Sequence, residues 1–396
     1  MPVGNHKNVI YGLALPLIGK RCRWSSAIRH GDAAPDQTAA ITRVLKRNHV
    51  VGASVQTMRD GALAACYTAG NAHLNPNTPV TPDTYFRTAS IAKMACALLV
   101  MRLQTLGKLD VQEDISALWG KLIRNPNYPQ TPIPLAALLS HTSGLADSPL
   151  FYSAYEKPVD VDTILRNTFT YTNMKPFERF RYSNFAAGLI GSLLEARFQV
   201  SLEALAQSEL FAPLGVRATF DITTLGDAQI ANAYRVLPSS RLPAFNAMER
   251  FHTSTPLNTP DPSTHYLLSS GNLYITAAGL MRLCLPLVNG GSNQGEPFLD
   301  ERSLRYMLSP TTAWPEPQVR MRHGLGLLEV EDAAIHPTRL HGHQGFAYGA
   351  VNGVFFDDKG NGFASLNSGA SEMRIGHLSC LNRDLIRVLL GGASHA

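Results

Sequence analysis

The chain has 396 residues, of which 45% are apolar and only 16% are charged, with 35 Lys and Arg against 30 Asp and Glu. That apolar content excludes an intrinsically disordered protein, and a net charge of +5 spread over this length excludes the basic stripe of a nucleic-acid-binding domain. The length suits one large core or two lobes.

The cysteines lie far apart in the sequence, and none forms the C-x-x-C spacing typical of zinc sites and dithiol redox centres. They are Cys22, Cys66, Cys96, Cys284 and Cys380. The sequence therefore indicates neither a disulfide scaffold nor a metal cluster, and it leaves open whether any single disulfide forms.

An apolar stretch near the N-terminus, residues 9–19, is a poor targeting signal. Residues 20–23, Lys-Arg-Cys-Arg, follow it where a signal-peptide cleavage site needs small residues. The stretch is also shorter than the roughly 20 apolar residues of a membrane-spanning helix. We interpret residues 1–34 as an N-terminal tail or a poor signal or anchor segment, and we expect no integral membrane span.

The structured part is predicted to begin with a helix and an antiparallel hairpin. Residues 36–49 carry apolar side chains at helical spacing, and residues 50–58 and 62–69 are typical of two strands. Between them, Asp60 and Gly61 supply the positive φ angles that a tight hairpin turn requires.

The far end of the chain is also rich in strands, whereas the middle is rich in helices. A second hairpin pairs residues 351–356 with residues 363–367, and a closing helix follows at residues 378–389. Between the hairpins, the apolar spacing predicts helices over residues 91–106, 135–139, 161–167, 186–198 and 202–211.

These elements predict an α+β fold: one antiparallel sheet built from both ends of the chain, flanked by N- and C-terminal helices, with an inserted helical lobe. In a single domain over residues 35–396, the sheet region takes about residues 35–90 and 265–396, and the lobe takes about residues 91–264. A cleft should run between lobe and sheet. Residues 237–265, rich in proline and without a clear period, form either a wall of a binding site or a mobile segment.

The motifs of several common enzymes are missing. The sequence has no G-x-S-x-G nucleophile elbow, no H-E-x-x-H zinc helix, and neither of the glycine-rich phosphate loops G-x-x-x-x-G-K and G-x-G-x-x-G. We expect no cofactor and no metal.

A serine three residues before a lysine opens a strongly apolar helix. Ser90 and Lys93 lie on one helical face, so the lysine amine can reach the hydroxyl. The amine can take the hydroxyl proton when burial lowers its pKa, and the apolar residues after Lys93 predict that burial. Of the nine lysines, only Lys93 follows a serine at this spacing. For this motif alone, a capping Ser90 and a lysine that extends to solvent remain the alternative.

A second motif, Tyr182-Ser183-Asn184, precedes the helix predicted from residue 186. The phenol of Tyr182 can relay protons, and the amide of Asn184 can hold a substrate carbonyl or the lysine. Residues 171–173 repeat the spacing, but they lie in an irregular stretch, so the later copy is preferred. The alternative is a tyrosine and an asparagine that cap a helix.

A third motif, His343-Gln344-Gly345, precedes the last hairpin and is the only H-x-G of the chain. A histidine flanked by glycines on a strand edge suits the close approach of a substrate backbone. Together with His341 it could hold a metal, but no further ligands accompany the pair. A further histidine, His141, is interpreted as an anchor of a turn.

In the order S-x-x-K, Y-x-N and H-x-G, the three motifs resemble the serine β-lactamase and penicillin-binding-protein family. The branch resembled contains class C β-lactamases, D-alanyl-D-alanine carboxypeptidases, D-aminopeptidases and esterases. Other segments similar to that branch lie within about residues 36–390 and are residues 86–90, 107–109 with Asp114, 138–145 and 213–215. The resemblance implies a β-lactamase/transpeptidase-like fold.

The resemblance also implies a role for each motif. Ser90 would be the acylated nucleophile, Lys93 its proton partner, and Tyr182 the group that carries the proton to the leaving group. Asn184 would hydrogen-bond the substrate amide, and His343 would face the cleft.

Two further features concern the third motif and its neighbour. Gly345 would belong to the substrate-binding strand, and the backbone N–H groups of Ser90 and Phe346 would form an oxyanion hole. Class C β-lactamases usually carry Lys-Thr-Gly as the third motif, so His343 is closer to the carboxypeptidase and aminopeptidase members. Gln344 replaces the usual hydroxyl residue, which puts recognition of a substrate carboxylate in doubt.

The expected activity is a serine hydrolase that forms an acyl-enzyme on amide or ester bonds. D-Alanyl peptides or D-amino-acid amides rank first as substrates, small esters second and β-lactams third. The rival from another class is a non-catalytic penicillin- or muropeptide-binding protein. The expected partner is a small-molecule or peptide substrate and no nucleic acid, and the oligomeric state is open. Cell-wall substrates imply the cell envelope or secretion, whereas the poor signal leaves a cytoplasmic location open.

Overall fold

The computed structural model describes residues 28–30, 35–226, 229–236, 241–245, 256–313 and 318–391. The apolar stretch at residues 9–19 lies outside these ranges, and so do residues 237–240 and 246–255 of the proline-rich segment. Among the described helices, none combines the length and the apolar character that crossing a membrane requires.

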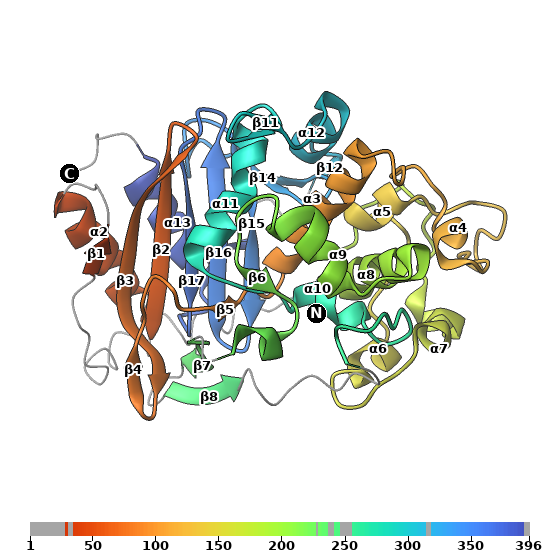
Figure 1. Cartoon of the computed structure of the whole chain (residues 1–396), viewed down its shortest axis with the longest axis horizontal. Helices are drawn as coiled ribbons and strands as arrows, with labels where there is room; N and C mark the ends of the chain where they lie inside the picture. Colours follow the sequence, from red (N-terminus) through yellow and green to blue (C-terminus); the bar gives the residue numbers. More distant parts are fainter. Residues whose placement is uncertain are drawn as a thin grey trace.

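A ten-stranded antiparallel sheet forms one side of the molecule, at the left in Figure 1. Its order is β1-β3-β2-β17-β16-β15-β14-β13-β12, with β4 paired to β3. The strands are β1 (Ile28–His30), β2 (Gly52–Arg59), β3 (Ala62–Leu74), β4 (Asn77–Pro79), β12 (Thr312–Ala313), β13 (Met321–His323), β14 (Leu328–Val330), β15 (Leu340–Ala347), β16 (Ala350–Asp357) and β17 (Gly362–Asn367). β2 pairs with β17, so the two ends of the chain meet in one sheet, as predicted.

The predicted first hairpin is confirmed. Asp60 and Gly61 join β2 to β3 with φ angles of 48° and 70°, in the left-handed region that Asp-Gly turns supply. A Cβ at position 61 would also lie 2.2 Å from the side-chain oxygen of Asn289, but that exposed side chain can move, so the need for glycine here is conformational.

Helices cover both faces of the sheet. α2 (Pro35–Arg47) and α13 (Cys380–Leu389) pack on one face, where the buried side chains of Leu45, Phe355 and Leu385 form part of a shared core. α11 (Ala277–Val288) lies on the opposite face. There its buried side chains form a second core together with Phe356 of β16 and Ala364 of β17. The alternation of Phe355 and Phe356 between the two cores follows from the two-residue repeat of a strand.

The helical lobe lies at the right in Figure 1, with α3 between it and the sheet. Its helices are α3 (Ile91–Thr105), α4 (Ile115–Trp119), α5 (Leu135–Leu139), α6 (Pro149–Ser153), α7 (Val161–Arg166), α8 (Asn184–Phe198), α9 (Leu202–Ala206), α10 (Tyr266–Gly271) and α12 (Glu301–Leu308). Single turns complete it: η2 (Thr168–Thr170), the π-type η3 (Gln207–Phe211) and η4 (Ile222–Leu225). α3 is buried on nearly every side because its sequence is apolar all round.

Short strand pairs connect these layers. They are β5 (Phe86–Arg87), β9 (Tyr274–Ile275) and β6 (Ala218–Thr219) in one small sheet, and the pairs β7 (Ala233–Val236) with β8 (Arg241–Phe245), β10 (Ser292–Asn293) with β11 (Glu296–Pro297), and β18 (Arg374–Ile375) with β19 (Leu378–Ser379). β5 leads directly into the start of α3 and fixes where that helix begins.

The sequence analysis missed the helices between residues 266 and 308. α11 contains Pro286 and is apolar over most of its surface, so its sequence carries no clear polar stripe. The predicted helix at residues 202–211 is also divided, since its second half widens into the π-turn η3.

Candidate active site

Ser90 stands at the N-terminus of α3, directly after a strained turn. Ala89 has a φ of 53°, and the N–H of Thr88 donates to the carbonyl of Leu273 at 2.8 Å, which anchors the approach to the helix. Ser90 occupies the N-cap position, yet its side chain makes no capping hydrogen bond. The alternative of a purely capping serine therefore fails, and the hydroxyl is free for chemistry.

Lys93 reaches back one helical turn to that hydroxyl. Its Nζ lies 3.2 Å from Ser90 Oγ, and it also donates to the backbone carbonyl of Ser270. The side chain is 5% exposed, so the amine does not extend to solvent. Burial lowers the pKa of Lys93 to about 7, although the charge of Asp147 opposes part of that shift. Near neutral pH a large fraction of the amine is thus neutral and can accept a proton.

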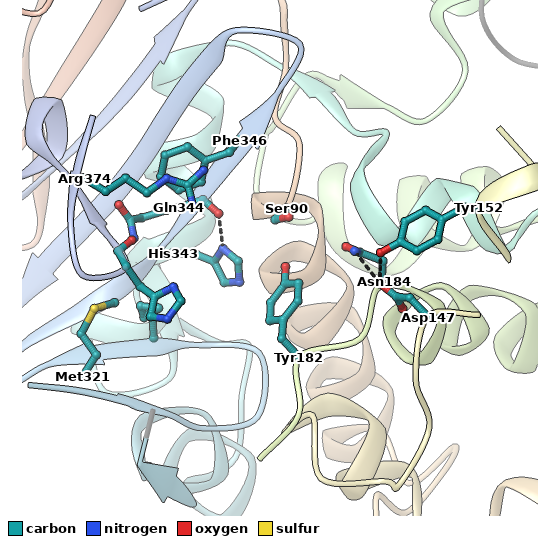
Figure 2. A pocket seen from close by; sticks show the side chains of 12 residues that line it. Ser90, Asp147, Tyr152, Tyr182, Asn184, Met321, His343, Gln344, Phe346 and Arg374 are labelled. Atoms are coloured by element: carbon teal, nitrogen blue, oxygen red, sulfur yellow. Dashed lines mark hydrogen bonds between the residues drawn. The ribbon is translucent and has the colours of Figure 1, made fainter. Parts of the chain in front are cut away.

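Tyr182 completes the centre from the lobe side. In Figure 2 its phenol points toward Ser90, and the two side chains share a hydrogen bond. Lys93 Nζ lies 5.2 Å from the centre of the Tyr182 ring. Burial raises the pKa of Tyr182 above its ordinary value, and the Ser90 hydrogen bond only partly opposes this rise. At neutral pH the phenol keeps its proton and can donate it.

Three buried histidine rings pack behind Tyr182. The His141 ring lies 4.3 Å from the Tyr182 ring, and His323 lies 4.9 Å from His141 and 6.2 Å from His343. Burial lowers the pKa of His323 to about 4 and that of His343 to about 3, and it lowers the pKa of His141 well below its usual range. All three rings are therefore neutral at pH 7, and no imidazolium charge lies beside Lys93.

His141 anchors the second motif, in agreement with its interpretation as a turn anchor. Its Nδ1 accepts the N–H of Ser183 at 3.3 Å, and its carbonyl accepts the N–H of Arg181 at 2.8 Å. The earlier copy of the motif lies elsewhere: Asn173 accepts a hydrogen bond from Tyr128 at an exposed position. The structure thus brings Tyr182, not Tyr171, to Ser90.

The third motif lies on β15, opposite Ser90. His343 faces the cleft, and its Nδ1 lies 2.7 Å from the carbonyl of Gln344. At position 345 an added Cβ would lie 2.1 Å from the carbonyl oxygen of Thr88, so only glycine lets β15 approach the turn before Ser90. The close approach of Gly345 to Thr88 keeps the next residue, Phe346 of the predicted oxyanion hole, beside Ser90.

Gln344 points to the other face of β15. Its Oε1 accepts hydrogen bonds from Ser379 N and Asn382 Nδ2, each at 3.0 Å, and its Nε2 donates to the carbonyl of His377 at 3.0 Å. The Gln344 amide thus bonds to the segment that leads into α13. It does not take over the role of the hydroxyl residue that the resemblance leads one to expect at this position. The side chain of Gln344 therefore does not bind a substrate carboxylate in the cleft.

Two cavities open on either side of Ser90. The larger cavity has a volume of about 450 Å³ and is lined by Tyr182, His343 and Arg374, among others. The smaller has a volume of about 270 Å³, and its lining includes Arg87 and Tyr155. Ser90, Asn184 and Phe346 line both cavities. A substrate can therefore place its acyl part on one side of the nucleophile and its leaving group on the other.

The sequence analysis missed Arg374 and Asp147, two charged residues that line the larger cavity. Arg374 lies 3.7 Å above the ring of Phe346 and faces the larger cavity, and Asp147 lies beside Asn184 (Figure 2). Asp147 follows the Ser-His-Thr-Ser-Gly-Leu segment by two residues, which is the one sequence signal that pointed to it. Nothing in the sequence brings Arg374 near Ser90.

Within the part of the chain that the structure describes, no group of three or more His, Cys, Asp and Glu side chains is arranged to hold a metal ion. His341 instead lies 3.3 Å from the carboxylate of Asp358 and packs against Phe356. His341 and the third-motif residue His343 thus have separate surroundings.

The family model described as Beta-lactamase matches residues 37–374. The chain belongs to this family. The predicted resemblance is thereby confirmed, and so is the predicted fold, which the solved structures below share.

Among curated proteins, the chain is 26% identical over 153 residues to Protein flp of Staphylococcus aureus (strain MRSA252), which covers 38% of this chain and 31% of that protein. It is 26% identical over 181 residues to Penicillin-binding protein 4 of Amycolatopsis lactamdurans, 44% of this chain and 46% of that protein. The matches thus span less than half the length of these relatives.

Similar solved structures cover 90% of the chain. A penicillin-binding protein homologue from Pyrococcus abyssi, described as octameric, has a TM-score of 0.71 at 20% identity over 77% of its own chain. The hydrolase EstCE1 has a TM-score of 0.69 at 20% identity, and the D-amino acid amidase of Ochrobactrum anthropi SV3 has 0.67 at 23%, each over 98% of its own chain. At these identities the likeness shows the fold alone.

Replacing Gly345 by Ala is expected to lower kcat/KM by about 100-fold, because the new Cβ would push β15 and Phe346 away from Ser90. Steady-state kinetics on p-nitrophenyl butyrate measures the loss, and circular dichroism shows whether the fold is kept. Wild-type kinetics in a folded Gly345→Ala protein would contradict the close approach.

The rate of acylation should rise with pH and level off above about pH 7, because Lys93 takes the proton of Ser90 only when its amine is neutral. Below that pH the rate should fall about tenfold per unit as the amine is protonated. A pH profile of kcat/KM measures this. A rate still rising steeply at pH 9 would mean that Lys93 has its ordinary pKa.

Proposed function

We propose that this protein is a serine hydrolase that cleaves amide or ester bonds through an acyl-enzyme on Ser90. The observation that carries the proposal is the contact between the Ser90 hydroxyl and the buried amine of Lys93, which lie 3.2 Å apart. The hydroxyl makes no helix-capping hydrogen bond. A purely structural serine at this position would cap the helix, and a purely structural lysine would extend its amine to solvent; neither arrangement is found. The family match is consistent with this chemistry.

The reaction follows from the positions of the side chains. Neutral Lys93 takes the proton of Ser90 as Oγ attacks the substrate carbonyl, and the carbonyl oxygen becomes an oxyanion. The N–H groups of Ser90 and Phe346 hold that oxyanion. The phenol of Tyr182 gives its proton to the departing amine or alcohol and regains one from Lys93, which returns the lysine to neutrality.

Deacylation reverses these roles with water as the nucleophile. Neutral Lys93 takes a proton from water as the water oxygen attacks the ester carbonyl, and this proton passes from Lys93 to Ser90 Oγ as Ser90 leaves. Ser90 and Tyr182 both line the larger cavity, which gives water a place beside the acyl carbonyl.

Among substrates, a D-alanyl peptide or a D-amino-acid amide remains first in order. The likeness to a D-amino acid amidase and to penicillin-binding proteins favours it, and the cavity adds a feature that the sequence did not indicate. The Arg374 guanidinium faces the larger cavity, where it supplies a positive charge for a substrate carboxylate that Gln344 cannot bind. A cell-envelope or secreted location follows from such substrates and is part of the proposal.

A carboxylesterase is the second candidate, favoured by the likeness to EstCE1 and by two exposed tyrosines, Tyr152 and Tyr155, at the cavities. A non-catalytic penicillin- or muropeptide-binding protein is the rival from another class. The intact contact of Ser90, Lys93 and Tyr182 argues against it.

Replacing Ser90 by Ala should abolish labelling by a fluorescent fluorophosphonate and lower hydrolysis by about 10⁴-fold. Ser309→Ala, an exposed serine at the end of α12, serves as the matched control and should be labelled like the wild type. Undiminished labelling of Ser90→Ala would end the proposal.

Turnover of three chromogenic substrates should rank D-alanine p-nitroanilide above p-nitrophenyl butyrate and both above nitrocefin, when each enzymatic rate is divided by the uncatalysed rate. Nitrocefin turnover faster than the other two would identify a β-lactamase instead. Labelling without turnover of any of them would favour the binding protein.

A further inference from the structure

The two cavities beside Ser90 differ in the part of a substrate that each can hold. Ser90 and Phe346 line both cavities, whereas Tyr182, among the described residues, lines only the larger one. In the proposed reaction Tyr182 gives its proton to the leaving group, so the leaving group occupies the larger cavity. The acyl part of the substrate then extends into the smaller cavity, whose chemistry decides which acyl groups bind.

Two arginines line the smaller cavity. Arg87 lies on β5, shortly before the nucleophile, and Arg235 lies on β7. The described residues that line the cavity with them include tyrosines and small residues but no Asp or Glu. The cavity therefore presents positive charge to a substrate, and its described lining offers no carboxylate that would compete with a bound anion.

Two neutral side chains orient Arg87. Its Nε donates to Oδ1 of Asn272 at 2.6 Å, and its guanidinium carbon lies 5.4 Å from the centre of the Tyr348 ring. Partial burial raises the pKa of Tyr155, which lines the same cavity, and the positive charge of Arg87 opposes that rise. The charge of Arg87 therefore acts on a group inside the cavity.

Backbone contacts bring Arg235 to the same cavity. The N–H of Ala231 donates to the carbonyl of Tyr85 at 2.8 Å, which ties the segment before β7 to the residue before β5. A Cβ added at position 349 would lie 2.7 Å from Arg235 Cα, so glycine lets the turn between β15 and β16 pack directly on β7. The side chain of Arg235 is exposed and can turn toward a ligand, whereas that of Arg87 is half-buried.

We propose that the smaller cavity recognises a carboxylate on the acyl part of the substrate, through the guanidinium groups of Arg87 and Arg235. A guanidinium offers paired N–H donors that match the two oxygens of a carboxylate. The inference rests on the proposed hydrolase and refines its substrate class to amides or esters of an acid that carries a second, free carboxylate. A D-alanyl peptide belongs to this class when an acidic side chain lies on its acyl side.

The test compares two esters with the same leaving group, mono-p-nitrophenyl adipate and its methyl ester. The acyl chain of the first ends in a carboxylate, and that of the second ends in a neutral group. After subtraction of the spontaneous rates, the wild type should favour the first by about tenfold in kcat/KM, as expected for a charge-assisted hydrogen bond. The preference should shrink when sodium chloride is added, because salt screens the exposed Arg235.

Variants of Arg235 test which residue creates this preference. Arg235→Gln removes one of the two positive charges, so the preference should fall to about threefold, and Arg235→Glu should lower it to about one. Arg305→Gln is the matched control: it removes an exposed positive charge on α12, outside the lining of both cavities, and should keep the wild-type preference. An unchanged preference in both variants of Arg235 would overturn the inference.

A second pair of esters tests which cavity holds the acyl part. 4-(Butyryloxy)benzoate carries its carboxylate on the leaving group, and its methyl ester carries none. The ratio of kcat/KM for these two esters should be the same in the wild type and in Arg235→Gln, because their leaving groups occupy the larger cavity. A ratio that falls in Arg235→Gln would place the leaving group in the smaller cavity and contradict the inference.

The two levels of the proposal fail differently. If the fluorophosphonate does not label Ser90 and none of the esters is hydrolysed, the hydrolase itself is wrong. If Ser90 is labelled and the wild type hydrolyses both adipate esters with equal efficiency, only the inference about Arg87 and Arg235 is wrong.

Discussion

The chemistry of this protein depends on one contact, between the hydroxyl of Ser90 and the amine of Lys93. The two side chains meet because they lie one turn apart at the start of a helix, and the amine is available as a base because α3 is buried nearly all round. An apolar helix thus does two things at once: it fills the core between the lobe and the sheet, and it desolvates the lysine.

The rest of the site positions groups around that contact. β15 can approach Ser90 only because residue 345 has no Cβ, and Tyr182 is held by the His141 ring and by the loop at Asp147. These pieces come from β15, inside the sheet, and from the lobe. The fold therefore supplies one cleft with a nucleophile in its floor and a separate cavity on either side of it.

Much of the fold and of the site could be predicted from the sequence, because both carry local signals. Neighbouring residues alone predict the Asp60-Gly61 turn and the helix after Ser90. Each of the three motifs is likewise a short local pattern that can be found in the sequence. What stayed hidden depends on tertiary contact: Asp147 meets residue 184 across the lobe, the Lys93 acceptor is a backbone carbonyl at Ser270, and Arg374 reaches the cavity from β18. Only Asp147 has a sequence signal, its position just after residues 138–145, and the other two contacts have none.

The measurement that tests this account most directly is the pKa of the Lys93 side chain in the folded protein. NMR of protein carrying ¹³C-labelled lysine, with Lys93 assigned from a Lys93→Arg variant, follows the ε-carbon as pH changes. The account predicts one lysine that titrates with a pKa of about 7. A Lys93 signal that titrates near the ordinary lysine value of about 10.4 would contradict it.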